Sequence, residues 1–388
     1  MQTLINLFRN NIRQYGMIIA LVFITALFWV LTEGITFNPL NLTNLILQNG
    51  FILVLAVGMV LVIITGNIDL SVGSVVAFVG AIAGVLMINN NVPVWLAIIL
   101  SIIVGALIGV WQGFWIAYIG IPSFIVTLAG MLIFRGLTLY LLDGQSLAPF
   151  PDSFGFLSGG FLPDMFGSGG LHTLTIILSV ILSIILVYLE IKNRKTQLQY
   201  SFEVVPMWIS ITKLVLLLSV INWFAYQLAL NKGIPMVLII VIILIVVYTF
   251  IMNNTVMGRR IYATGGNKKA ADLSGIKTKG VVFWVFVNNG VIAALAGLMF
   301  ASRLDSATPA AGNMLELDAI AAVFIGGASM SGGVGTIIGA IVGGLVMGVM
   351  NNGMSLIGIG IDWQQAIKGM VLLLAVGFDV YNKNRAGK

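Results

Sequence analysis

The chain has 388 residues, of which 59% are hydrophobic and only 8% are charged. Because a soluble globular domain carries about 25% charged residues, 19 basic and 13 acidic residues cannot cover a water-facing surface, and the composition predicts an integral membrane protein. The absence of cysteine excludes disulfides, thiol nucleophiles, zinc–thiolate sites and iron–sulfur clusters.

Apolar stretches follow one another along the chain. A membrane-spanning helix needs roughly 20 mostly apolar residues, and about twelve stretches are candidates. The first lacks a small-residue cleavage pattern, so we expect a retained helix and not a signal peptide. Stretches 70–89, 317–332 and 335–352 are short and Gly-rich, and each could be a broken or re-entrant helix. The predicted fold is an all-α polytopic membrane protein with about 10–12 transmembrane helices in a single domain. The candidate spans are 15–33, 45–65, 70–89, 93–119, 123–142, 171–190, 208–230, 235–252, 281–301, 317–332, 335–352 and 363–381.

The basic residues indicate the orientation of these spans. Most of them fall in four segments, 9–13, 192–195, 259–279 and 383–388. With the spans above and a cytoplasmic N-terminus, all four segments and the C-terminus lie in the cytoplasm. The loop 143–170, which has no Lys or Arg, then lies outside. This agreement with the positive-inside rule explains the net charge of +6 without nucleic-acid binding.

A short polar stretch between two predicted spans is GNIDLSVGS (66–74). Acidic residues inside spans often mark a proton or sodium path, and Asp69 is the best candidate for one. Asn67 and the glycines beside it favour a turn, so Asp69 could instead cap a helix that begins at 70–71. Both interpretations remain open. Arg135 and Lys368 are cations within predicted spans and could pair with backbone carbonyls or with an acid.

The outer loop 143–170 is too polar and too rich in Gly and Pro to span the membrane. We expect it to form part of the surface on which an extracytoplasmic protein docks, with Asp143, Asp152 and Asp164 available to basic residues of that partner. The alternative is an ordered cap over the helices with no partner role.

Glycine patterns indicate close helix packing. GALIG (105–109) and GTIIG (335–339) place small residues four apart, which lets helix backbones approach closely in lipid. GALIGVWQG (105–113) also resembles GGLVMGVMNNG (343–353), and the two segments cross the membrane in opposite directions in the predicted topology. This similarity is of the kind that inverted repeats produce.

Residues 263–280, ATGGNKKAADLSGIKTKG, form a basic, turn-rich segment between two apolar runs. Asn267 is a suitable N-cap and Gly275 a suitable stop for a short cytoplasmic helix. Ala270, Ala271, Leu273 and Ser274 give it a small-sided, mildly apolar patch. The patch could dock on a partner protein, or the lysines could only contact anionic lipid. The small side chains favour a partner, because a lipid-binding helix is usually richer in large apolar residues.

The sequence has no phosphate-binding loop, no metalloprotease motif and no nucleophile elbow. We therefore expect no catalytic residue, no metal and no cofactor in this chain. Few acids lie within the predicted spans, so a chain of buried carboxylates for proton coupling is not evident. The energy for any transport is then expected to come from another protein.

Several motifs together resemble the monosaccharide-type permeases of bacterial ABC importers. They occur in order, and the resemblance runs from about residue 40 to residue 381. The extra length around 190–235, with an added pair of spans, is similar to that of the xylose and multiple-monosaccharide permeases. The motifs are GNIDLSVGS, IPSFIVTLAGMLIFRGL (121–137), ATGGNKKAADLSGIKT (263–278), FIGGASMSGGVGTIIGAIVGGLVMGVMNNG (324–353) and WQQAIKGMVLLLAV (363–376).

The resemblance implies a permease domain in the bacterial inner membrane, covering the whole chain, with a cytoplasmic coupling loop at 253–280. Its implied partners are an ATP-binding cassette ATPase, an extracytoplasmic sugar-binding protein, a second copy of the chain and membrane lipid. Asn67, Asp69, Ser71 and Arg135 are implied to line or gate the pathway, although Asn67 stands where the family usually has glycine. The residues implied to couple to the ATPase are Gly266, Asn267, Ala270, Ala271, Ser274, Gly275 and Ile276.

Two other functions remain open at this level. The first is an ion-coupled secondary sugar carrier that uses Asp69, and the second is a passive channel or membrane scaffold. Neither would need an ATPase.

Overall fold

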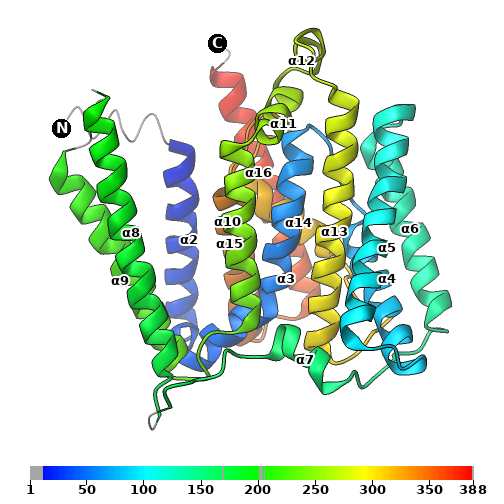
Figure 1. The fold of residues 1–388 in the computed structure, drawn as a ribbon, viewed down its shortest axis with the longest axis horizontal. Helices are drawn as coiled ribbons and strands as arrows, with labels where there is room; N and C mark the ends of the chain where they lie inside the picture. The colour runs from blue at the N-terminus through cyan, green and yellow to red at the C-terminus, as the bar shows by residue number, and fades with distance from the viewer. Residues whose placement is uncertain (1–11, 168–169, 201–203, 205, 387–388) are drawn as a thin grey trace.

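The computed structural model describes residues 12–167, 170–200, 204 and 206–386, and within them the backbone is almost entirely helical (Figure 1). Its helices, in chain order, are α2 (Ile12–Leu31), η1 (Ile35–Phe37), α3 (Pro39–Ile64), α4 (Val72–Gly84), η2 (Val85–Asn89), α5 (Val94–Phe114), η3 (Trp115–Ile119), α6 (Ser123–Leu141), α7 (Asp152–Gly159), α8 (Thr173–Gln199), α9 (Met207–Ala229), α10 (Met236–Asn254), α11 (Val256–Gly266), α12 (Lys268–Leu273), α13 (Thr278–Leu304), α14 (Leu315–Ile325), α15 (Ile337–Leu356) and α16 (Ile361–Ala386).

Most predicted spans are continuous helices. Among the described residues, 9 helices are long and apolar enough to cross a membrane, and they include the doubtful stretches 70–89 and 335–352. The third doubtful stretch, 317–332, is not a continuous span. Its helix, α14, has 11 residues, and a rise of 1.5 Å per residue gives about 16 Å, roughly half of the hydrocarbon core. The prediction of a full span there is therefore wrong, and the broken-helix alternative is correct.

The ends of the bundle agree with the predicted orientation. The described start of α2 and the end of α16 lie at the same end as α12, whereas α7, from the loop 143–170, lies at the opposite end (Figure 1). By the positive-inside rule, the α12 end is cytoplasmic.

Two helices begin inside the bundle. Non-helical residues 65–71 precede α4, and residues 305–314, also outside the helices, precede α14. The two starting points meet, because a Cβ added to Gly73 of α4 would collide with the Glu316 side chain and the Gly312 carbonyl. Non-helical backbone at membrane depth is tolerated only where protein or a water-filled cavity surrounds it.

The segments α3–α6 and α13–α16 pack in equivalent ways. In the first segment, α4 packs on α5 and α6 and also on α13 of the second segment. In the second segment, α14 packs on α15 and α16 and also on α3 of the first segment. Likewise α5 packs on α13, and α15 packs on α3. This exchange of roles is what inverted repeats predict.

Glycine permits these close contacts, as the sequence predicted. A Cβ at Gly109 of α5 would lie 2.5 Å from the Phe286 carbonyl oxygen of α13. In the second segment, a Cβ at Gly343 of α15 would collide with the Ala322 carbonyl of α14. Any side chain at these positions would push two helices apart.

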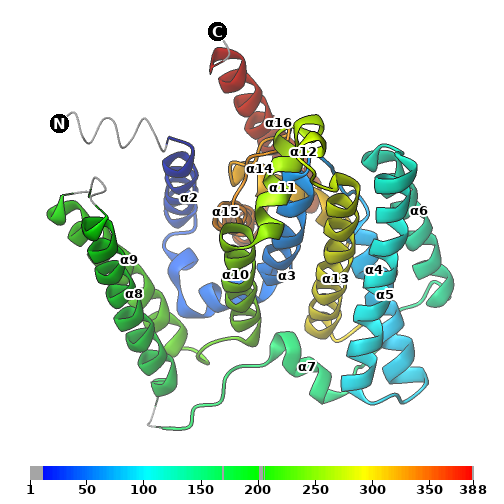
Figure 2. The same cartoon turned by 45° about the horizontal axis from the view of Figure 1, so that its top comes forward.

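The hairpin of α8 and α9 lies where the sequence predicted an added pair of spans, around 190–235, but it begins earlier, at Thr173, and ends at Ala229. The hairpin stands at the edge of the bundle, on the side away from α5 and α6 (Figures 1 and 2). Its two helices are joined in their apolar parts by Asn222, which donates to Ser183 Oγ (2.9 Å) and accepts from Ser179 Oγ (3.2 Å). Only 11% of the residues in the most apolar stretch of α8, and 0% in that of α9, are buried, so most of their side chains can contact lipid or another protein.

The described part of the outer loop packs against the ends of the helices. Phe154 of α7 is fully buried, and Ser302 of α13 donates to its carbonyl (2.8 Å). The Phe150 amide donates to Asp305 (3.0 Å). These contacts fix the loop as a cap over the ends of the helices.

Candidate functional site

The predicted cytoplasmic helix exists and has the predicted boundaries. The Asn267 side-chain oxygen accepts a hydrogen bond from the Ala270 amide (3.0 Å), and α12 follows it directly. Gly275 ends the element with a φ of 82°, in the left-handed region that favours glycine. Two short sequence signals therefore predict this helix correctly.

The side chains of α12 divide into an outer and an inner set. Ala270 and Ser274 are exposed, and Leu273 is 91% exposed. Ala271 is only 5% exposed and Ile276 is half-buried, because both pack against the rest of the chain. The apolar patch expected on this helix is therefore split: Leu273 is its outward apolar side chain, and Ala271 is not available to a partner.

The preceding helix, α11, contacts the end of α3 and the non-helical segment 326–336, between α14 and α15. Tyr262 donates its hydroxyl to the Gly335 carbonyl (2.8 Å), in the segment between α14 and α15. The Gly333 amide donates to the Ile64 carbonyl (2.8 Å), at the end of α3. Gly265 lies against both partners, and a Cβ there would be 2.7 Å from the Gly333 nitrogen. Burial raises the pKa of the Tyr262 phenol, which keeps this hydroxyl a neutral donor.

Gly266, at the end of α11, also belongs to this contact. A Cβ at Gly333 would lie 2.7 Å from the Gly266 Cα, so the two backbones are in close contact. The coupling residues expected from the sequence therefore lie together. Some are exposed on α12, whereas Gly266 takes part in the contact between α11 and the segment 326–336.

A buried polar cluster lies where α4 begins. Asp69 accepts hydrogen bonds from the Ser71 amide (2.8 Å), from Ser71 Oγ (2.6 Å) and from Asn289 Nδ2 of α13 (2.7 Å). Gln112 Nε2 of α5 donates to Ser71 Oγ (2.6 Å). All four residues are at most 2% exposed. α4 begins at Val72 with Ser71 at its N-cap and no side-chain capping bond, so the interpretation of Asp69 as the cap of a helix that begins at 70–71 is wrong. Asp69 instead fastens the turn before α4 to α13.

Two residues expected beside Asp69 lie elsewhere. Asn67 donates to Thr65 Oγ1 (3.0 Å) and stays outside the cluster. Arg135 of α6 donates to the carbonyls of Pro309 (3.2 Å) and Ala311 (2.6 Å), in the non-helical segment before α14. Each discontinuous segment is therefore held by its own polar contacts.

Sequence reasoning missed two acids at the start of α14. Glu316 and Asp318 are both buried, and Asp318 forms an ion pair with Lys368 of α16 (3.0 Å). The low count of acids within spans was therefore incomplete. Two features of the sequence could have indicated this ion pair: acids in a short, Gly-rich stretch, and Lys368 in a later predicted span, where a buried cation needs a partner.

The outer acids differ from one another. Asp143 and Asp152 are exposed, as a docking surface requires. Asp164 instead accepts hydrogen bonds from the amides of Thr173 (2.9 Å) and Leu174 (3.3 Å), at the start of α8. Desolvation alone would raise the pKa of Asp164, but these amides and that of Phe166 outweigh it, so the pKa lies below its usual range.

Comparison with known proteins identifies the family. Residues 41–376 match the family described as "Branched-chain amino acid transport system / permease component". The chain belongs to this permease family. The xylose transport system permease protein of Haemophilus influenzae is 38% identical over 375 residues, which cover 97% of this chain and 98% of that protein. The ribose import permease protein of Bacillus subtilis is 37% identical over 342 residues, or 88% of this chain and 85% of that protein.

No solved structure matches the chain. The similar permeases are named for monosaccharides, and the resemblance drawn from the sequence is thereby confirmed: the chain is a multi-pass inner-membrane protein related to the monosaccharide permeases of ABC importers. The ion-coupled alternative named Asp69, and three donors of the chain itself already occupy that carboxylate.

Proposed function

We propose that this chain is the transmembrane permease subunit of an ATP-driven importer for a monosaccharide, xylose or a related sugar. A separate ATPase binds its cytoplasmic end, an extracytoplasmic protein delivers the sugar, and a second copy of the chain completes the pore. The names of the similar permeases support the sugar class.

The observation that carries this proposal is the contact of α11, which leads into α12, with the end of α3 and with the segment 326–336. A protein that binds α12 has direct mechanical access, through Tyr262 and Gly265, to the end of α3 and to the segment before α15. A passive channel or scaffold has no use for an exposed, capped helix connected in this way.

The proposed mechanism follows these contacts. The ATPase holds the exposed side of α12 at Ala270, Leu273 and Ser274, and ATP-driven closure displaces α11 and α12 together. The displacement reaches the segment 65–71 through Ile64 and the segment 326–336 through Gly335. Because interfaces this closely packed switch between discrete arrangements, a small shift at α11 can change which side of the pore is open.

Three coupling residues expected from the sequence have supporting roles in this scheme. Asn267 and Gly275 set the start and the end of α12, and Ala271 fixes it to the chain. Asn67, Asp69, Ser71 and Arg135 hold the discontinuous segments in place and do not contact the ATPase.

At the outer end, the cap formed by 143–170 offers Asp143 and Asp152 to the sugar-binding protein. Basic residues on that partner would speed docking and make it sensitive to salt.

The test is uptake of radiolabelled xylose into proteoliposomes that contain the chain, its ATPase and its binding protein. Uptake should need ATP and both partners. Sugar uptake by the chain alone, unaffected by ATP, would exclude the proposal.

A matched pair of variants tests the docking face. Leu273→Asp should reduce co-purification of the ATPase while the chain still inserts, because it places a charge on the outward apolar side chain. Leu304→Asp is the control, since Leu304 is also exposed (47%) but ends α13 at the opposite side of the membrane. Equal ATPase recovery with both variants would argue against docking at α12.

A further inference from the structure

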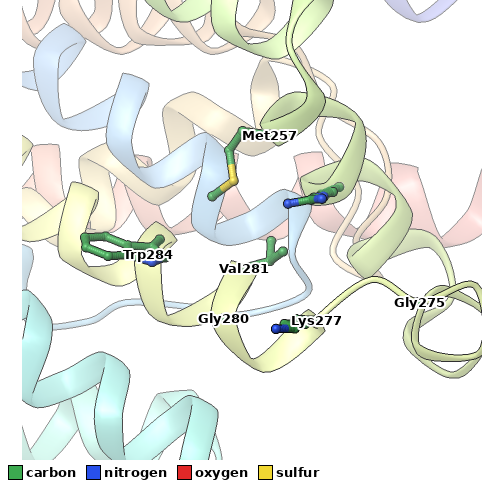
Figure 3. Close-up of a pocket in the computed structure, with 7 residues that line it drawn as sticks. Met257, Gly275, Lys277, Gly280, Val281 and Trp284 are labelled. Carbon is green, nitrogen blue, oxygen red and sulfur yellow. The ribbon is translucent and has the colours of Figure 1, made fainter.

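A groove lies beside α12, between α11 and the start of α13, and has a volume of about 350 Å³. Figure 3 shows side chains from both helices around it, with Met257 on α11 and Trp284 on α13. Its lining residues are Met257, Arg260, Gly275, Lys277, Gly280, Val281 and Trp284.

The charge of the groove is entirely positive. Arg260 and Lys277 line it, both are exposed, and no acidic side chain is among the lining residues. Within the described part of the chain, neither cation has an ion-pair partner. The nearby Asp272 is engaged elsewhere, since its Oδ1 accepts from Thr278 Oγ1 (2.6 Å). The groove therefore offers two free cations to an anion.

The walls of the groove are apolar and lie near the cytoplasmic start of α13. Trp284 is 60% exposed and follows the start of the membrane-spanning helix α13 by six residues, or about 9 Å. Phe283 packs edge-on against Trp284 and also contacts Tyr118 at the cytoplasmic end of the neighbouring helix. Such aromatic groups are typical of the boundary between hydrocarbon and headgroups.

We propose that this groove binds the headgroup of an anionic phospholipid of the cytoplasmic leaflet. Arg260 and Lys277 contact the phosphate, and Met257 and Trp284 flank the upper part of the acyl chains. A soluble phosphate would not use the apolar walls. The ATPase is the less suitable occupant, because the exposed Leu273 lies on α12, which projects beyond α11 and α13 (Figure 1).

Lipid binding in this groove does not depend on the proposed contact between α12 and the ATPase, although the groove adjoins α12. The same groove wall carries Gly275, the glycine that ends α12. A bound headgroup would therefore brace the short connection between α12 and α13.

The experiment measures binding of phosphatidylglycerol and phosphatidylcholine with identical acyl chains to the purified full chain, by native mass spectrometry. The test variant is Arg260→Gln/Lys277→Gln. The control is Lys268→Gln/Lys269→Gln, which removes the same charge from α12 outside this groove. Unfolding midpoints in phosphatidylcholine verify that both variants fold.

We expect the test variant to bind phosphatidylglycerol about 30-fold more weakly, since each basic residue near an anionic surface contributes about fivefold. The control should lose less than about fivefold, and neither variant should change phosphatidylcholine binding. Glycerol phosphate, which lacks acyl chains, should not compete at equal concentration.

Three results would overturn the proposal. Equal losses in both variants would mean a diffuse basic surface. Full competition by glycerol phosphate would mean a soluble anion site. Unchanged phosphatidylglycerol binding, with loss of ATPase co-purification in the test variant only, would assign the groove to the ATPase.

Discussion

The two equivalent segments of the molecule start a helix inside the membrane in the same way, but they secure it by different chemistry. Before α4, a single carboxylate, Asp69, accepts from neutral donors on α13 and on its own turn. Beside α14, Asp318 pairs with Lys368, and Arg135 holds the preceding backbone carbonyls. The first arrangement depends on hydrogen bonds to a buried acceptor, and the second depends on charge.

This difference has energetic consequences. The Asp69 cluster is closed to solvent, whereas the Lys368 side chain is 23% exposed. Both sites leave one buried oxygen without a hydrogen-bond partner among the described residues, Asn289 Oδ1 in the first and Glu316 Oε2 in the second, so the difference rests on exposure. We therefore expect the α4 segment to tolerate substitution less well than the α14 segment.

The strongest test of this expectation is Asp69→Ala. It leaves the Ser71 and Asn289 donors buried without an acceptor, and we expect the free energy of unfolding to fall by about 3 kcal/mol or more. Asp69→Asn keeps one acceptor oxygen and should cost less. Thermal unfolding in detergent measures both. If Asp69→Ala costs no more than Asp143→Ala, an exposed outer acid, the cluster is not a structural centre.

The charged segment is tested by Lys368→Met. It leaves Asp318 buried without its cation, and because Lys368 is partly exposed the loss should be about 2 kcal/mol, between the values typical of surface and buried pairs. Adding Asp318→Asn should recover more than half of this loss. Purely additive effects in the same unfolding assay would show that the two residues do not form a stabilising pair.

Helix contact in the two segments is tested by glycine substitutions. Gly109→Ala should cost about 1–2 kcal/mol, because the added methyl meets the α13 backbone, which cannot move aside alone. Gly343→Ala is the equivalent change on α15 and should cost a similar amount. Gly136→Ala on α6 meets nothing within 4 Å and should be neutral or stabilising. A loss at Gly136 equal to that at Gly109 would refute the close-contact explanation.

Local signals in the sequence predicted the local structure well. Asn267 and Gly275 define α12 because capping depends on neighbouring residues only, and the apolar runs locate most spans. The shortness of α14 was not predicted with certainty, because its hydropathy does not reveal where the chain leaves the helix. The contacts of the Asp69 cluster were not predicted either. Gln112 and Asn289 are single polar residues in apolar runs, and only the tertiary fold brings Gln112 to Ser71 and Asn289 to Asp69.

The smallest expected effect on stability is that of Tyr262→Phe. It removes one hydrogen bond, to the Gly335 carbonyl, and keeps the ring, so unfolding should change by only about 1 kcal/mol. Tyr140→Phe is the matched control, because Tyr140 is 85% exposed at the outer end of α6. This change separates an effect on stability from an effect on transport, because α11 contacts α3 and the segment 326–336 but belongs to neither of the two equivalent segments, α3–α6 and α13–α16.

The most direct measurement of the central claim is therefore the number of sugars transported per ATP hydrolysed by the reconstituted importer carrying Tyr262→Phe. The account predicts that this ratio falls while the ATPase still co-purifies and Tyr140→Phe behaves like the wild type. An unchanged ratio with Tyr262→Phe would contradict the claim that α11 transmits the ATPase movement to the segment 326–336.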